Sequence, residues 1–242
     1  MKLAVMQPYF FPYLGYFQLI HSVEHFMFFD DVQYLRKSWM SRNRLLSIEK
    51  KAPFYIRPEL IKPPYQTLLP EVKLSTDERW KLKLLEQTNT YKNIAPFYDE
   101  VRMLLEKILT PKYTFLSEFN IQSTIAICDA LTLTKKFDKY SDYEFWFNEK
   151  PGPAEWGYFI AKELSASQYI NAPGGEEFIT SKPFQKAGIE LGFIQPNLSF
   201  YDQSIENFIP GLSILDVLFF NGIKNTERLV KQYHLKWKRD GL

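Results

Sequence analysis

The sequence predicts an α/β fold: a Rossmann-like open sheet of mainly parallel strands, with a helical subdomain inserted in the middle of the chain. Toward both ends, short apolar runs alternate with helical patterns, as they do in βαβ units. Between residues 75 and 135 the apolar residues instead keep helical spacing. The chain has 242 residues, 45% of them apolar, which suffices for one large core. We therefore expect a single α/β domain over residues 1–242, with residues 75–135 as its helical subdomain.

The first βαβ unit is expected at the N-terminus. Lys2–Met6 is a short apolar run that stops before a proline, as a buried strand does when it enters a loop. Two prolines in Gln7–Tyr13 (QPYFFPY) exclude regular structure there. From Leu14 the apolar positions suit one face of a helix, and His25–Phe29 predicts a second strand. Such a unit belongs to a parallel sheet and has a right-handed crossover.

The middle of the chain predicts one short strand and three helices. Five prolines between Pro53 and Pro70 leave room only for a strand at Phe54–Arg57 and an extended loop. Ser75 or Thr76 suits the N-cap of the first helix. The three helices are expected from this cap to Tyr91, from Pro96 to Leu109 and from Leu116 to Leu133, with a polar loop after them.

The last third returns to alternating strands and helices, and Gly222 suits the position just after a helix. The expected strands are Gln168–Ile170 and Ile189–Ile194, with a tight turn at Asn171–Gly175. The expected helices are Ala154–Ser165, Leu212–Asn221 and Asn225–Tyr233.

Charge and cysteine content narrow the function classes. The net charge is +2, from 30 basic and 28 acidic residues, so the composition requires neither nucleic acid nor an anionic membrane as a partner. Cys128 is the one cysteine and lies in an apolar run, which favours a packing role and a reducing compartment. No apolar run is long enough to span a membrane, and the N-terminus does not fit a secretory signal. We expect a cytoplasmic protein without membrane insertion.

The first candidate site is the loop that leaves the first strand. In an open parallel sheet, ligands bind beyond the carboxyl ends of the strands, where the N-terminus of the next helix also offers its amides. A glycine in the first turn of that helix allows close backbone approach, and the aromatic residues would wall a cleft. An irregular connection packed by aromatic side chains remains the alternative. The candidate binding residues here are Gln7, Pro8, Tyr13, Gly15 and Tyr16.

Asp30 and Asp31 end the second predicted strand at the same edge of the sheet. A carboxylate in this position often binds a sugar hydroxyl or a metal, or takes a proton, so both are candidate catalytic residues. Because adjacent residues of a strand point in opposite directions, only one of them is expected to face the crevice. Alternatively, the pair caps a turn or helix.

The segment Leu35–Arg44 (LRKSWMSRNR) combines cations with an aromatic ring. Arginine and lysine side chains suit a phosphate or carboxylate, and tryptophan offers a stacking face. Such a segment also suits single-stranded RNA. The cluster is short and the remaining charge is balanced, so a phosphorylated small molecule fits better than nucleic acid; a solvated basic loop is the alternative. Its donors include Arg36, and its candidate binding residues are Lys37, Trp39, Arg42, Asn43 and Arg44.

Further candidates come from the last third of the chain and from the histidines. The turn at Asn171–Gly175 suits either an anion-binding backbone concavity or a plain turn. Of the three histidines, His21 is the candidate base, with a satisfied or exposed histidine as the alternative, and no metal site is expected from so few histidines and one cysteine. The additional binding candidates are Asn171, Gly174, Gly175, Tyr201, Gln203, Ser213 and Asp216; Ser213 also suits a helix N-cap.

The sequence resembles the WbqC-like family of bacterial proteins in segments that follow the family's order from the first residues to about Gly222. These segments are MQPYFFPYLGYFQLI, FFDDVQYLRKSWMSRNRL, SQYINAPGGEEF, GIELGFIQPN and FYDQSIENFIPGLSILDVLFFNG. The family occurs in gene clusters for O-antigen and other surface polysaccharides. The resemblance implies a transferase that moves a glycyl or other aminoacyl group to a nucleotide- or lipid-linked amino sugar, or a non-catalytic protein of the same pathway.

A fainter resemblance concerns nucleotidylyltransferases and pantothenate synthetase. Tyr13-Leu14-Gly15-Tyr16 has the spacing of their H-x-G-H motif, which holds ATP phosphates at the start of a helix. The glycine matches, whereas tyrosine replaces both histidines. An ATP-using ligase with a degenerate motif is thus a third hypothesis, with ATP as its cofactor.

Overall fold

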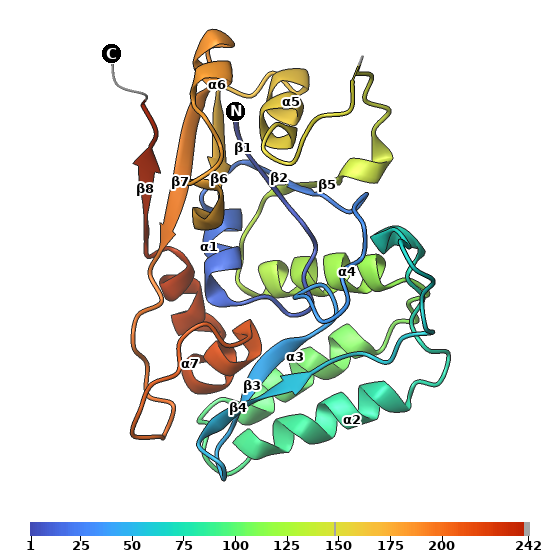
Figure 1. Cartoon of the computed structure of the whole chain (residues 1–242). Coiled ribbons are helices and arrows are strands. Elements are labelled where there is room, and N and C mark those ends of the chain that lie inside the picture. Colours follow the sequence, from blue (N-terminus) through green and yellow to red (C-terminus); the bar gives the residue numbers. More distant parts are fainter. Residues whose placement is uncertain (148, 240–242) are drawn as a thin grey trace.

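Six strands form one sheet in the order β5–β2–β1–β6–β7–β8 in the computed structural model, which describes residues 1–147 and 149–239 (Figure 1). The strands are β1 (Lys2–Met6), β2 (His25–Phe28), β5 (Lys136–Lys139), β6 (Gln168–Asn171), β7 (Glu190–Pro196) and β8 (Tyr233–Trp237). Neighbouring strands run parallel, except that β8 pairs antiparallel with β7. The sheet is open and mainly parallel, which confirms the predicted fold class.

The chain changes direction across the sheet between β1 and β6. From β1 it continues to β2 and β5 on one side, and from β6 to β7 and β8 on the other. Ligands of open parallel sheets bind beyond the carboxyl ends of the strands at such a reversal. Here these two strand ends lead into the loop Gln7–Tyr13 and the turn Asn171–Gly175.

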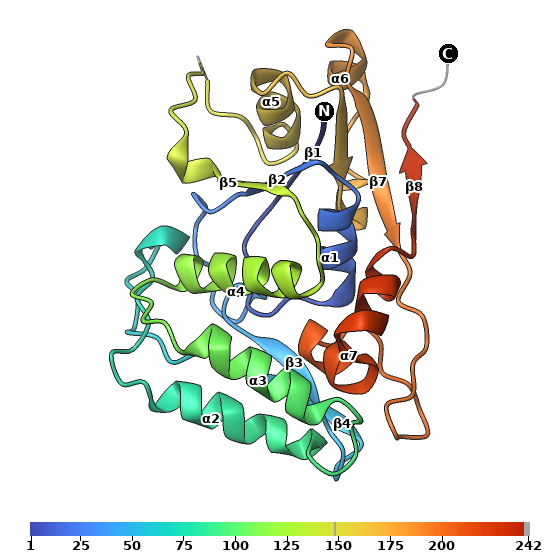
Figure 2. The same ribbon diagram turned by 180° about the vertical axis from the view of Figure 1, so that it is seen from behind.

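The sheet separates two buried clusters of apolar side chains. Side chains alternate along a strand, so Ala4 and Phe28 join one cluster while Leu3 and Met27 join the other. Helices cover both faces, as Figure 2 shows from behind. The first cluster includes residues of α1 (Leu14–His21), α4 (Leu116–Ala130) and α7 (Ile214–Val230), and the second includes residues of α5 (Trp156–Glu163) and α6 (Lys182–Lys186).

The predicted helices of the middle segment form a layer on one side of the sheet (Figure 1). They are α2 (Arg79–Gln87), α3 (Tyr98–Leu109) and α4, with the 3-10 turn η2 (Thr88–Tyr91) between the first two. The predicted cap of the first helix is wrong. Its N-cap is Glu78, and the Ser75 hydroxyl accepts a hydrogen bond of 3.2 Å from the Asp77 amide in the preceding turn. The description of residues 75–135 as a subdomain stays a prediction.

Three strands and a helix were not predicted. The hairpin strand β3 (Asn43–Ser47) pairs with β4 (Ala52–Ile56), which starts and ends before the predicted Phe54–Arg57. The expected polar loop after Leu133 is wrong, because it contains the edge strand β5. The last predicted helix is also wrong at its end, since α7 ends at Val230 and Tyr233 begins β8. The helix α6 and the short turns η1 (Leu69–Glu71), η3 (Tyr140–Asp142) and η4 (Pro173–Gly175) complete the elements.

Gly222 lies at a kink where two helical segments meet within α7, which confirms the prediction that it follows a helix. Its backbone has φ 67° and ψ 176°, a conformation essentially restricted to glycine. A Cβ atom at this position would lie 2.6 Å from Cδ1 of Phe97. The glycine therefore both bends the helix and admits the Phe97 ring.

We expect Gly222→Ala to lower the free energy of unfolding by roughly 2–4 kcal/mol, from backbone strain and overpacking together. Gly188→Ala is the matched control, because Gly188 also has a positive φ (71°) but a Cβ atom there would meet nothing within 4 Å. The control should lose only about 1 kcal/mol. Denaturant unfolding of both variants measures the difference; equal losses would contradict the role of Phe97.

Candidate functional site

The loop Gln7–Tyr13 is held by side chains from three other elements. The Asn43 amide of β3 donates to the carbonyls of Phe10 and Phe11 at 3.1 and 2.7 Å. The Asn120 amide of α4 donates to the carbonyl of Pro8 at 3.1 Å. The Ser213 hydroxyl, just before α7, donates to the Phe11 carbonyl at 2.8 Å. Asn43 and Ser213, predicted to bind substrate, thus hold the loop in place.

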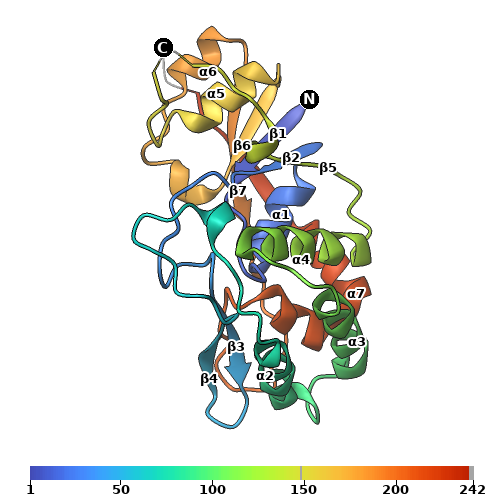
Figure 3. The same cartoon turned by 90° about the vertical axis from the view of Figure 1, so that its right-hand side faces the viewer.

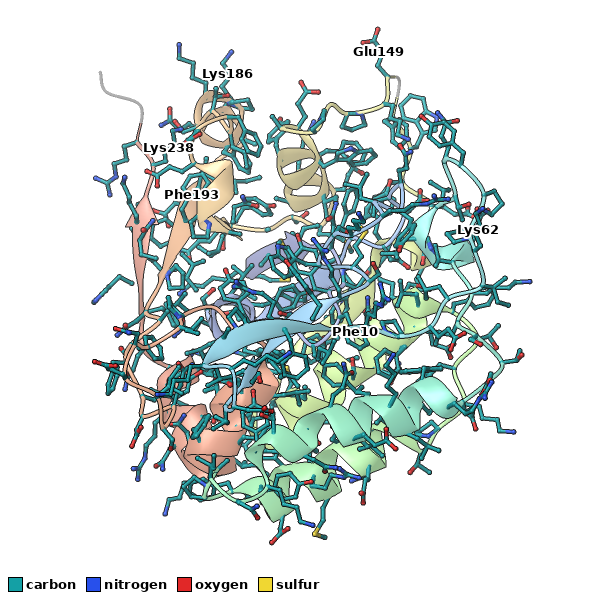
Figure 4. All side chains as sticks on the ribbon, turned by 60° about the horizontal axis from the view of Figure 1, so that its bottom comes forward. Phe10, Lys62, Glu149, Lys186, Phe193 and Lys238 are labelled. Carbon is teal, nitrogen blue, oxygen red and sulfur yellow. The ribbon has the colours of Figure 1, made fainter. Side chains whose placement is uncertain are left out.

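The aromatic residues of this region mostly pack inside the protein instead of walling an open cleft. Phe10 and Phe11 are fully buried, and Figure 4 places Phe10 near the centre of the molecule. Tyr16 is 2% exposed and its hydroxyl donates to the Gln7 carbonyl at 2.9 Å. The Tyr13 ring leaves room only for glycine at position 15, because a Cβ atom there would lie 2.5 Å from Cε2 of Tyr13. Tyr13 itself is half-buried.

Asn120 is a loop-holding residue that sequence reasoning missed. Its amide also donates to the Met40 carbonyl at 2.8 Å, so it joins the loop after β1 to the segment before β3. We expect Asn120→Ala to lower the free energy of unfolding by about 2–3 kcal/mol, since two buried carbonyls lose their donor. Gln122→Ala, at an exposed site on the same helix, should change it by less than about 0.5 kcal/mol. Chemical denaturation compares the two; similar losses would refute the assigned role.

The strongest candidate for ligand binding is a group of four side chains, the arginine cluster: Trp39, Arg42, Arg44 and Tyr55. Arg42 and Arg44 are two apart along the chain as it enters β3 and therefore share a face, and Tyr55 pairs with Arg44 across the hairpin. The Arg42 guanidinium carbon lies 4.2 Å from the centre of the Tyr55 ring, and that of Arg44 lies 5.6 Å from the Trp39 ring. Trp39 and Tyr55 are 42% and 48% exposed, so solvent reaches the cluster.

The two arginines of the cluster have unused hydrogen-bonding capacity. The Nε atoms of Arg42 and Arg44 are buried without a hydrogen-bond partner among the described residues. Arg44 donates from Nη2 to the carbonyl of Gly211 at 3.2 Å. No ion pair within residues 1–147 and 149–239 includes either arginine. Buried donors are nearly always satisfied in folded proteins, and guanidinium groups suit two-pronged binding of phosphate or carboxylate.

The two candidate aspartates have different environments. Asp30 is 2% exposed and accepts hydrogen bonds from the amide and the hydroxyl of Ser141 at 3.0 and 2.6 Å, which joins the end of β2 to η3. Asp31 is exposed to solvent. The burial of Tyr140 raises the pKa of that tyrosine, and the nearby charge of Asp31 raises it further. Asp31 is therefore the aspartate open to solvent, and Asp30 holds the local turn.

His21 is not brought together with these aspartates. It is the last residue of α1, and β2 separates it in the chain from Asp30. Its Nδ1 shares a hydrogen bond of 3.1 Å with the Tyr233 hydroxyl at the start of β8. Burial lowers the pKa of His21, and Lys135 lowers it further. A joint acid–base role of His21 with Asp30 is thus not supported by the contacts.

Four candidates from the last third do meet, around the start of α7. Asp216 is fully buried and accepts hydrogen bonds from Tyr201 (2.5 Å), Gln203 (3.0 Å) and Tyr91 (2.6 Å), and burial raises its pKa. Tyr91 was not predicted to take part. Ser213 is the N-cap of α7, and its amide donates to the Arg44 carbonyl at 3.0 Å. The buried Asp216 network thereby adjoins the arginine cluster.

The turn after β6 is a compact structural turn. The Asn171 side chain accepts a hydrogen bond from the Tyr169 hydroxyl at 3.0 Å and donates to the Ala172 carbonyl at 3.1 Å. A Cβ at Gly175 would lie 2.1 Å from Nδ2 of Asn171, so this glycine makes room for the asparagine, whereas a Cβ at Gly174 would meet nothing within 4 Å.

Lys37, a candidate from the segment before β3, lies in a loop; its side chain is exposed and its backbone φ is 60°.

A wide groove of about 730 Å³ lies between the hairpin and the α2–η2 segment. Its lining includes Glu49, Lys50 and Glu86, and none of the predicted site residues. Within the described residues, no group of three or more His, Cys, Asp or Glu side chains is placed to hold a metal ion. No described helix combines the length and apolar character needed to cross a bilayer.

The fold and the cluster together define an α/β protein with a mainly parallel sheet and two half-buried arginines, each beside an exposed aromatic ring. Residues 7–228 match the WbqC-like protein family, and the chain belongs to that family. The uncharacterised protein Rv1507c of Mycobacterium tuberculosis (strain ATCC 25618 / H37Rv) is 26% identical over 229 residues, which are 94% of this chain and 97% of that protein. No solved structure matches the chain.

Proposed function

We propose that this protein binds the phosphate-bearing part of a nucleotide- or lipid-linked amino sugar at the arginine cluster. The pair of buried, unpartnered Nε atoms on Arg42 and Arg44 carries the proposal, because an anionic ligand would supply the acceptors that the described residues do not. The Trp39 and Tyr55 rings would keep the guanidinium planes in position and offer a face for a base or sugar. RNA is not proposed as the ligand, because two arginines suit a single phosphorylated molecule better than a nucleic-acid strand.

We infer transferase chemistry from the family resemblance: an aminoacyl group passes to the sugar amine during assembly of O-antigen or another surface polysaccharide in the cytoplasm. The amine nitrogen attacks the carbonyl carbon of an activated aminoacyl donor, a C–N bond forms, and the donor's leaving group departs with its electron pair. The amine loses a proton to a general base. Asp31 is proposed as that base, because it is the solvent-exposed carboxylate after β2.

A non-catalytic sugar-nucleotide-binding protein of the same pathway is the second candidate. It is favoured by the engagement of Asp30 with Ser141 and by the separation of His21 from the aspartates, which leave no assembled acid–base pair among these described candidates. Asp31→Asn distinguishes the two functions. A transferase should lose product formation by mass spectrometry while still binding the sugar nucleotide, whereas a binding protein shows no product with either version.

A thermal-shift screen tests the binding proposal, because a ligand that binds the folded state raises its stability. Nucleotide sugars, pyrophosphate, ATP and free amino acids are compared at equal concentration. Phosphate-bearing compounds are expected to raise Tm, and free amino acids alone are not. Absence of any response to nucleotide sugars and pyrophosphate would overturn the assignment.

A further inference from the structure

Two loops lie side by side at the edge of the molecule and form what we name the basic loop pair, residues 32–38 and 61–68. The Tyr34 amide donates to the Thr67 carbonyl at 2.9 Å, and the Leu69 amide donates to the Val32 carbonyl at 2.8 Å. The Arg36 guanidinium donates to the Pro63 carbonyl at 3.2 Å. Figure 3 shows the pair projecting beside η1, and Figure 4 places Lys62 at the periphery.

The basic loop pair exposes large apolar side chains. Tyr65 is 87% exposed, Leu35 55% and Ile61 50%. Exposed apolar surface costs roughly 25 cal/mol per Å² relative to burial. Here the side chains are presented on loops joined to each other by backbone hydrogen bonds. The loops thus hold several apolar groups out to solvent in a fixed arrangement.

The same loops carry one sign of charge. Arg36, Lys37 and Lys62 lie among the apolar side chains, and no aspartate or glutamate occurs within residues 32–38 or 61–68; the exposed carboxylates Asp31 and Glu71 flank the pair. The protein as a whole is nearly neutral, with 30 basic and 28 acidic residues. The surface is therefore locally basic, and its charge complements an anionic partner.

We propose that the basic loop pair docks this protein on an anionic membrane surface. Leu35, Ile61 and Tyr65 enter the headgroup region, where tyrosine is favoured, while the cations contact lipid phosphates. A membrane fits better than a protein partner because the apolar groups stand on separate loops and are interleaved with cations. Each cation near an anionic leaflet adds to the attraction, and salt weakens it.

Co-sedimentation of the full chain with vesicles tests this proposal. Vesicles of phosphatidylcholine alone are compared with vesicles that also contain phosphatidylserine. Binding is expected to the anionic vesicles and should fall as the salt concentration rises. The variants Leu35→Ser/Tyr65→Ser and Lys37→Glu/Lys62→Glu should each weaken binding at least about tenfold. Retention of full binding by both variants would overturn the proposal.

Matched controls lie on the helical layer. Leu82→Ser/Met103→Ser and Lys83→Glu/Lys107→Glu change exposed side chains of α2 and α3 by the same chemistry and should bind vesicles as the parent does. The Leu35→Ser/Tyr65→Ser variant should keep the thermal response to nucleotide sugars, which separates this proposal from that for the arginine cluster. Failure to bind anionic vesicles, with salt-sensitive binding to a soluble acidic polypeptide instead, would assign the surface to a protein partner and refute membrane docking.

Discussion

Alanine in place of both Arg42 and Arg44 is expected to abolish the thermal response to pyrophosphate and nucleotide sugars. Each single variant should weaken binding by about 10- to 100-fold, because each loses charge-assisted hydrogen bonds worth roughly 1.5–3 kcal/mol. Arg44→Ala also removes the contact with the Gly211 carbonyl, so its unfolding free energy must be measured beside its affinity. Isothermal titration gives the affinities directly.

The charge-conserving variants sharpen this test. Arg42→Lys keeps the positive charge but cannot offer two parallel donors, so it should recover only part of the affinity. Arg79→Ala is the control, because Arg79 is an exposed arginine of α2, outside the cluster, and pairs with Asp77. This variant should bind the ligands as the parent protein does. Equal affinity in the double alanine variant and in Arg79→Ala would remove the arginine cluster as the binding site.

The largest expected effect on stability is that of Asp216→Ala. The change leaves the Tyr91 and Tyr201 hydroxyls and the Gln203 amide without their shared buried acceptor, which should lower the free energy of unfolding by about 3–5 kcal/mol. Glu86→Ala, which removes an exposed helical carboxylate, should change it by less than about 0.5 kcal/mol. Denaturant titration measures both, and a small loss in Asp216→Ala would contradict a structural role of the network.

The pH dependence of this stability has a defined sign. Burial raises the pKa of Asp216 in the folded state, so the folded protein holds this proton more tightly than the unfolded chain does. The stabilising contribution of the raised pKa is complete below the ordinary carboxyl pKa and is lost as the pH rises through the raised pKa. The parent should therefore lose stability relative to Asp216→Asn as the pH rises above the ordinary carboxyl pKa of about 4. An unchanged difference would show that the pKa is not raised.

Local sequence patterns predicted the elements that have strong periodicity. β1, α1 and β2 follow the predicted order, and the three helices of the middle segment are present, since buried faces and proline positions mark them. β5 was missed because its sequence, Lys136–Lys139, is rich in charged residues and pairs at the sheet edge. β8 was missed because its partner β7 lies about forty residues earlier in the chain, and pairing at that separation leaves little local signal.

The candidate site could be predicted only in part for a similar reason. The composition of Leu35–Arg44 identified Arg42 and Arg44, but the Tyr55 ring depends on the hairpin register and the Gly211 carbonyl on a distant loop. The Asp216 network likewise needed Tyr91 from the helical segment. Asn43 and Ser213 were polar residues in suggestive positions, whose side chains satisfy backbone carbonyls of the aromatic loop.

A crystal structure of the protein with a nucleoside diphosphate sugar tests the central claim most directly. The proposal predicts phosphate oxygens within hydrogen-bonding distance of the Nε atoms of both Arg42 and Arg44, with the Trp39 or Tyr55 ring against the ligand. Phosphate density at the Asn171–Gly175 turn, or at the N-terminus of α1, with both Nε atoms still unpartnered, would contradict it.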